Sequence, residues 1–318
     1  MCLFFRLLQC FILGLICCEF AIADTTPQSS TIWLDKLLGL STTLYEPDFS
    51  KTSPFNITIY KVGIHPLHNP KRLFEVYAPL VDLFNANIPN VKFVLEASKN
   101  YEEFDKKLYA GKFDFAMPNP FQTINALKHG YHVFAKMGDD ESFRGIILVR
   151  VDTGIKHISD LKGKVVAYPA PTALAGTLMP QYYLQTHGLN INTDIENIYV
   201  GSQESSIMNV LNRKVAAGAT WTLPWKAFIK NDPELAQQLE VKWQTESLIN
   251  NSWVARNDMP TEIIKKITDV LLHLADTSEG KNILATIPIS NFEAANDETY
   301  KPVEAFINHF NTIVRPLN

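Results

Sequence analysis

The sequence predicts an α/β protein built of two lobes. Short β-rich segments alternate with segments of helical apolar spacing, and the same alternation starts a second time near residue 145. The chain has 318 residues, which is enough for two domains. The net charge of -4 excludes a protein that binds nucleic acids through an overall basic charge. We therefore expect helices packed on a mostly parallel sheet in each lobe.

The first 23 residues have the composition of a secretory signal peptide. Arg6 precedes an apolar run over residues 7–18, and Ala21 and Ala23 follow it, which predicts export and cleavage after Ala23. The run is short for an uncleaved membrane anchor. All four cysteines lie within the first 18 residues, so the mature chain is expected to use neither cysteine nucleophiles nor disulfides.

Residues 24–54 are interpreted as an N-terminal extension. Their ends are polar and contain proline, and residues 31–45 have the spacing of a short amphipathic helix. No segment after the signal peptide offers about 20 uninterrupted apolar residues, so no membrane span is expected there. We assign residues 55–146 and 248–318 to the first lobe and residues 147–247 to the second.

The first lobe is expected to follow a strand–helix order. Residues 57–64 are β-rich and end at a proline-marked loop, 65–70. Asn119 can cap a helix whose first residue is Pro120. The other expected elements are a helix over 73–87, a strand over 91–95, a helix over 101–110 and a strand over 113–117.

The second lobe repeats this order. Residues 165–168 form an expected strand, and residues 172–187 an expected helix that closes at Gly188. The other expected strands are 146–149, 198–200 and 216–220, with a short helix or turn over 158–164 and a helix over 202–212. The chain is expected to end in helices around 263–275, 280–285 and 303–312.

The sequence contains few catalytic or metal-binding motifs. The sequence lacks a nucleophile elbow, a P-loop, a zincin motif and a dinucleotide-binding motif. His65 and His68 have the spacing of two metal ligands, as do His129 and His132, but no nearby carboxylate completes either site. We therefore expect neither a metal nor a cofactor. Residues 250–252 match a glycosylation acceptor, a pattern that is frequent by chance.

Three loops that follow strands carry more information about function. They are residues 117–122, 168–176 and 200–206, and each leads into a helix start. In open α/β sheets ligands lie beyond the carboxyl ends of strands, where helix N-termini present free N–H groups. Thr172 could cap the second helix, and Gly176 allows a close approach. Every such unit needs a cap, so each loop alone could be structural. Together they predict a site for a small oxyanion or polar ligand between the lobes.

At these loops the sequence resembles the PhnD-like phosphate, phosphite and phosphonate substrate-binding proteins of ABC transporters. The residues that carry the resemblance are 158–167, 172–180 and 201–206, together with a C-terminal pattern at 256–260, 277–281 and 297–300. It implies a two-lobe type II periplasmic-binding-protein fold, also called a Venus flytrap, with two hinge crossings near 146–152 and 243–250. The ligand would be captured in the cleft between the lobes.

The sequence departs from the family pattern in the pocket. The hydroxyl-rich family turn corresponds to residues 172–176, which contain only one hydroxyl side chain, and a family histidine corresponds to Gln203. A family aspartate corresponds to Ala216. The predicted ligand-binding residues are His65, Asn119, Phe121, Thr172, Ala173, Gln203, Glu204 and Trp221. Thr172 and the Ala173 N–H would donate hydrogen bonds, and Gln203 and Glu204 would recognise polar or protonated ligand groups.

The sequence therefore predicts an exported, monomeric solute-binding protein without catalysis, which presents a small ligand to an ABC transporter permease. A ligand sensor coupled to a membrane signalling partner is a second hypothesis, motivated by the extension and the altered pocket. An enzyme on the same scaffold is a third, since some pyrimidine-synthase relatives use a histidine-rich active site. No nucleic-acid partner is expected.

Overall fold

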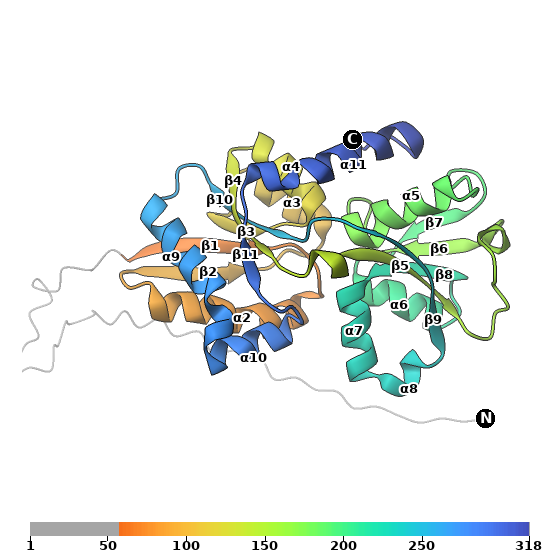
Figure 1. Cartoon of the computed structure of the whole chain (residues 1–318), viewed down its shortest axis with the longest axis horizontal. Coiled ribbons are helices and arrows are strands. Elements are labelled where there is room, and N and C mark those ends of the chain that lie inside the picture. Colours follow the sequence, from red (N-terminus) through yellow and green to blue (C-terminus); the bar gives the residue numbers. More distant parts are fainter. Residues whose placement is uncertain (1–56, 318) are drawn as a thin grey trace, which may run out of the picture. The chain divides into compact units, whose positions relative to one another are not determined.

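Two β-sheets organise the described part of the chain, residues 57–317 of this computed structural model (Figure 1). The predicted signal peptide, residues 1–23, and the extension, residues 24–54, lie outside this range, so they stay predictions. Within the described range no helix is both long and apolar enough to cross a membrane.

The first sheet has six strands in the order β11-β4-β10-β3-β1-β2. In Figure 1 it lies on the left, with its first strands in orange. Its strands are β1 (Thr58–Ile64), β2 (Val91–Glu96), β3 (Phe115–Met117), β4 (Tyr131–Met137), β10 (Ser252–Arg256) and β11 (Phe292–Ala294). Its helices are α2 (Pro70–Asn87), α3 (Tyr101–Tyr109), α4 (Pro120–Lys128), α9 (Thr261–Leu272), α10 (Ser278–Thr286) and α11 (Lys301–Ile313). We call this group of elements lobe 1.

The second sheet has five strands in the order β7-β6-β8-β5-β9 and lies on the right in Figure 1. Its strands are β5 (Arg144–Arg150), β6 (Val165–Tyr168), β7 (Glu196–Tyr199), β8 (Ala217–Trp221) and β9 (Leu239–Ser247). Its helices are a π-helical turn (Leu174–Leu178), α5 (Met179–Thr186), α6 (Gln203–Leu211), α7 (Thr222–Asn231) and α8 (Pro233–Ala236). We call this group lobe 2.

Aromatic packing fills the core of lobe 1. Phe84 of α2 meets Phe93 of β2 with ring centroids 5.8 Å apart, and it meets Trp253 of β10 at the same distance. All three side chains are fully buried. Burial of such large apolar groups contributes on the order of 2–3 kcal/mol each, so the core fixes the strand ends that lead into the site.

The expectation of mostly parallel sheets was wrong. Strands β1, β2 and β3 pair in parallel, as do β6, β7 and β8. Strand β10, however, is inserted antiparallel between β3 and β4, and β5 runs antiparallel to both β8 and β9. The physical reason is the path of the chain, because the strands that lead out of one lobe and back again run against the βα units.

The two crossings between the sheets are short and lie side by side. Residues 138–143 connect β4 to β5, and residues 248–251 connect β9 to β10. The Met137 N–H donates to Asn251 O at 2.9 Å, and the Leu248 N–H donates to Phe143 O at 3.2 Å. The first crossing was expected at 146–152. Residues 146–150 belong instead to β5, because this apolar strand starts at Arg144. The second had been expected to begin at 243, within β9.

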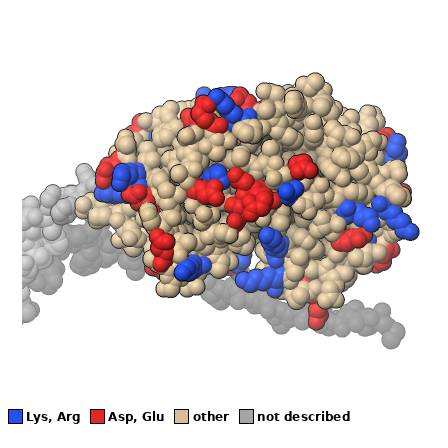
Figure 2. Space-filling model, in the orientation of Figure 1, with Lys and Arg blue, Asp and Glu red and all other residues tan. Residues whose placement is uncertain are grey.

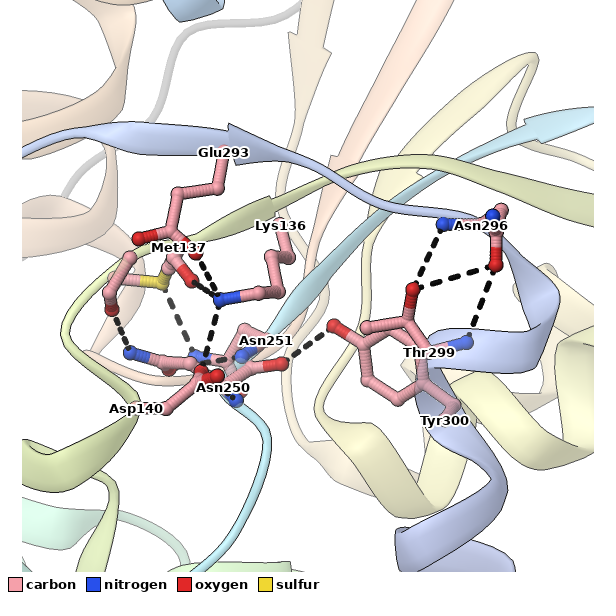
Figure 3. A network of polar contacts seen from close by, with 10 residues as sticks. Lys136, Met137, Asp140, Asn250, Asn251, Glu293, Asn296, Thr299 and Tyr300 are labelled. Carbon is pink, nitrogen blue, oxygen red and sulfur yellow. Dashed lines mark hydrogen bonds and ion pairs between the residues drawn. The ribbon is translucent and has the colours of Figure 1, made fainter.

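A polar network stabilises these crossings (Figure 3). The buried Lys136 ammonium lies 3.0 Å from Asp140 Oδ1 and 2.6 Å from Glu293 Oε2. Asp140 Oδ1 also accepts the Asn250 N–H at 2.9 Å, while the Asn250 side chain donates to Gly138 O at 2.8 Å. One lysine thus connects β4, β11 and the first crossing, and Asp140 connects that crossing to the second.

The C-terminal helix α11 makes a further link between the lobes. Phe306 packs against Tyr182 of α5 with ring centroids 5.3 Å apart. Just beyond the helix, Val314 O accepts a hydrogen bond from the Asn192 side chain at 2.9 Å, and the Arg315 guanidinium donates to Pro171 O at 3.2 Å. In Figure 1 α11 extends along one edge of the molecule from lobe 1 towards α5.

Candidate functional site

The carboxyl ends of the strands from both sheets meet at a small cavity between the lobes. His65 directly follows β1, Asn119 lies two residues after β3, and Trp221 ends β8. The cavity is lined by His65, Tyr101, Asn119, Phe143, Ala173, Leu174, Ala175, Gly176, Gln203, Trp221 and Asn251. Ligands of open α/β sheets bind at such strand ends, so this cavity is the candidate site.

The free space in the cavity is small, with room for about one water molecule. The lobes contact each other around it. Asn119 Nδ2 of lobe 1 donates to Thr172 O of lobe 2 at 3.2 Å. Tyr101 of lobe 1 packs with Ala170 and Ala173 of lobe 2. In this conformation the lobes therefore touch around a cavity that has no room for a ligand larger than water.

The lobe 1 wall combines polar and aromatic groups. Asn119 caps α4, because its Oδ1 accepts the Gln122 N–H at 3.0 Å. In turn, the Gln122 side-chain oxygen accepts the Asn119 N–H at 2.9 Å. This confirms the predicted N-cap and the position of Pro120 at the helix start. The His65 ring is buried, with Nδ1 2.9 Å from Met117 O.

The lobe 2 wall is the start of the π-helical turn. Ala173 O accepts both the Thr177 and the Leu178 N–H, at 2.8 and 3.1 Å. Within the described residues, the N–H groups of 174–176 have no hydrogen-bond partner, and all three residues line the cavity. Free N–H groups at a helix start form a binding site for anions or other acceptors.

The structure differs from the expected helix start at Thr172 and Ala173. The helix begins at Leu174 and the Thr172 side chain does not cap it. The Ala173 N–H already donates to Ala170 O at 3.2 Å, so it is not free for a ligand. The donors to the cavity are one to three residues further along, because the turn before the π-helix uses the Ala173 amide.

Gln203 lies at the start of α6 and is buried against this turn. Its Oε1 accepts a hydrogen bond from Thr220 Oγ1 at 2.9 Å. A methyl group on Gly176 would lie 2.7 Å from Gln203 Oε1 and 2.9 Å from a ring carbon of Pro169. The close approach expected at Gly176 is therefore made by the Gln203 side chain. Trp221 closes the cavity with Phe143, their ring centroids 5.1 Å apart.

Three predicted residues lie outside the cavity. Phe121 and Thr172 line a separate hollow beside α11, together with Asp105. Glu204 points away from the cavity, and its Oε1 lies 2.6 Å from His68 Nδ1 of lobe 1. Five of the eight predicted residues thus line one cavity: His65, Asn119, Ala173, Gln203 and Trp221.

Three further residues of the site carry no ligand-binding motif in the sequence. Tyr101, Phe143 and Asn251 also line the cavity. Asn251 was noted only within a glycosylation pattern, yet it is 1% exposed and belongs to the second crossing. His68 was considered only as a metal ligand, whereas it bridges the lobes through Glu204. Across residues 57–317, no cluster of three or more potential metal-ligating side chains is found.

The electrostatics of the cavity depend on dipoles rather than on charged side chains. None of the described lining residues is a lysine, arginine, aspartate or glutamate. Burial lowers the pKa of His65 to about 4, so its ring is neutral at pH 7. Next to the site, burial raises the pKa of Asp105 to about 6, while a hydrogen bond from Gln122 opposes that shift.

The chain is similar to known proteins over most of its length. The family model described as "ABC transporter, phosphonate, periplasmic substrate-binding protein" matches residues 62–300. The chain belongs to this family. The family is a substrate-binding component of transporters and not an enzyme family. A relative from Prochlorococcus marinus, described as the probable ABC transporter phosphite binding protein PhnD1, is 26% identical over 205 residues, which are 60% of this chain and 67% of the relative.

Solved structures of family members have the same fold. The methylphosphonate complex of PhnD1 from Prochlorococcus marinus superposes with a TM-score of 0.74 at 22% identity, covering 80% of this chain and 99% of that one. The binding component of an ABC phosphonate transporter from Pseudomonas aeruginosa gives a TM-score of 0.73 at 19% identity, covering 80% and 87%. The fold is that of a type II periplasmic binding protein, as the sequence predicted.

Proposed function

We propose that this family member captures a phosphonate-type oxyanion in the cavity between its lobes and presents it to the permease of an ABC transporter. The observation that carries the proposal is the cavity between the lobes. It is lined by residues 174–176, whose N–H groups have no partner in the described residues, and by the buried side chains of His65 and Asn119 from the opposite lobe. Lobe closure around a ligand is the motion known for binding proteins of this architecture. The free space in this conformation holds about one water molecule, so the lobes would have to move apart to admit a ligand of several atoms.

Export and oligomeric state belong to the same proposal. We infer a periplasmic protein whose signal peptide is cleaved after Ala23 and which acts as a monomer. On the face shown in Figure 2, basic and acidic residues are interspersed, and the largest acidic group lies near the middle. The mixed charge of this face gives no support to a nucleic acid as the partner.

A membrane sensor remains the second candidate for the protein partner. Its support is the N-terminal extension, residues 24–54, which precedes the family match at residue 62. Both candidates require the same ligand-driven closure. Reconstitution with a permease and ATPase would give ligand-dependent ATP hydrolysis for the transport role, whereas a sensor would leave the ATPase rate unchanged.

The ligand class is tested by thermal unfolding of refolded, ligand-free protein. We expect phosphate, phosphite or methylphosphonate at about 100 times the dissociation constant to raise the melting temperature by several degrees, because binding to the folded state adds about 2.7 kcal/mol to its stability. Amino acids and small heterocycles serve as controls. A shift with one of these classes and with none of the oxyanions would refute the proposed ligand.

A further inference from the structure

The orientation of the His65 ring restricts what the cavity can bind. Nδ1 lies 2.9 Å from Met117 O, and the His65 backbone N–H donates to the same oxygen at 3.1 Å. A carbonyl oxygen only accepts hydrogen bonds, so Nδ1 must carry a proton. Tyr101 and Phe104 hold the ring edge-on, with centroids 6.1 and 6.4 Å away. The neutral ring therefore has an unprotonated Nε2.

The surroundings of His65 keep the ring neutral. The side chain is 2% exposed, and burial lowers its pKa to about 4. The titratable groups that face it are His68 on its own loop, Tyr101 on α3 and, beyond His68, Glu204 on α6. His68 lowers the pKa further, and the Glu204 carboxylate is already paired with His68. Nothing among these groups holds a second proton on the ring at neutral pH.

The opposite wall of the cavity presents hydrogen-bond donors, whereas His65 Nε2 is an acceptor. The N–H groups of residues 174–176 are donors that need acceptor oxygens. Gln203, which is 2% exposed, has its Oε1 occupied by Thr220. A fully ionised dianion would satisfy the donors but would meet the lone pair of His65 Nε2 and no positive side chain. Burying two charges without a counter-charge is costly.

We propose that the cavity selects an oxyanion that carries one proton: two oxygens accept from the N–H groups of 174–176, and the protonated oxygen donates to His65 Nε2. This inference rests on the proposed function and names the ligand form within it. The chemical class is the monoanion of a phosphonate, phosphite or phosphate. A sulfonate has the same shape and charge as such a monoanion, but no proton to donate.

The test compares methylphosphonate with methanesulfonate by calorimetric titration from about pH 6 to 9. At pH 6 we expect methylphosphonate to bind at least about 100-fold more tightly, because a site built around one hydrogen bond strongly rejects the analogue that lacks it. Above the second ionisation of the ligand, its affinity should fall about tenfold per pH unit, and binding should take up one proton, measured in buffers of different ionisation enthalpy.

The variant His65→Gln supplies an N–H donor to the cavity. We therefore expect its affinity for methylphosphonate to exceed that for methanesulfonate by less than about tenfold. Its melting temperature checks that the variant is folded. Methylphosphonate binding that does not change with pH, or equal binding of methanesulfonate by the unmodified protein, would overturn this inference and leave the proposed function intact. Failure of both anions to bind at every pH would overturn the proposed function as well.

Discussion

At the scale of single residues, buried polar side chains give the cavity its chemistry. His65, Asn119 and Gln203 are each less than 5% exposed, and their hydrogen bonds fix their orientation. Such groups are costly to disturb, because a buried donor or acceptor that loses its partner costs about 1–3 kcal/mol. The neighbouring Asp105 is a further case, since it carries a carboxyl group where burial disfavours the charge.

We predict that Asp105→Asn stabilises the protein at neutral pH. Burial raises the folded-state pKa of Asp105 to about 6, above its ordinary 3.8. The folded state therefore binds more protons than the unfolded state between about pH 4 and 6, and the free energy of unfolding falls as the pH rises through that window. The asparagine amide carries no charge, so this loss of unfolding free energy does not occur. Its oxygen can still accept the hydrogen bond from the Gln122 side chain. Urea unfolding at pH 7.5 should show a gain of about 3 kcal/mol, most of which disappears near pH 4.

Only some of these residues can be predicted from the sequence. Asn119 is predictable because its capping bonds are local, formed with the residue three positions later. Thr172 and Ala173 are not, because the shift to a π-helical start depends on which carbonyl accepts each N–H. The partner of Glu204 is 136 positions away in the chain, and local patterns carry no information on such a pair.

At the scale of elements, the start of α4 has two functions. It follows the turn after β3, and it connects the two lobes. Asn119 Oδ1 caps the helix and Nδ2 donates to Thr172 O across the cleft. Family resemblance and helix-start patterns were enough to predict that this loop faces the cleft. The mixed sheets and the positions of the crossings were not predictable from the same patterns, because an inserted strand such as β10 has the same local sequence signal as a parallel one.

Two substitutions separate the functions of Asn119. Asn119→Ala removes both bonds, so we expect a loss of about 1 kcal/mol in unfolding free energy together with weaker oxyanion binding. Asn119→Asp keeps the capping oxygen but removes the N–H donor and adds a negative charge. We expect stability close to that of the unmodified protein and at least tenfold weaker binding. Urea unfolding and calorimetry measure the two effects; equal stability losses in both variants would contradict the capping role.

At the scale of the whole molecule, function depends on the balance between open and closed lobes. Contacts across the cleft include the Asn119–Thr172 bond, the His68–Glu204 pair and the C-terminal link through Arg315. The hinge itself is tied by hydrogen bonds between the two crossings. Ligand affinity therefore includes the free energy of closure, and residues outside the cavity can change it.

Glu204→Gln tests that coupling. The substitution keeps the shape but removes the charge that faces His68, 2.6 Å away. The pair is partly exposed, so we expect a loss of about 1 kcal/mol from the closed state, which is about fivefold in ligand affinity. Small-angle scattering should show a larger radius of gyration for the ligand-free variant than for the unmodified protein. An unchanged radius and an unchanged affinity would show that this pair does not hold the lobes together.

The central claim is that an oxyanion binds inside the cavity between the lobes. Calorimetric titration of methylphosphonate against Gln203→Glu tests it most directly, because this near-isosteric change places a carboxylate in a cavity without a positive side chain. Gln237→Glu makes the same charge change on the exposed surface. We predict one site per chain in the unmodified protein and in Gln237→Glu, and at least a hundredfold loss of affinity in Gln203→Glu. Equal affinity in all three proteins would contradict the account.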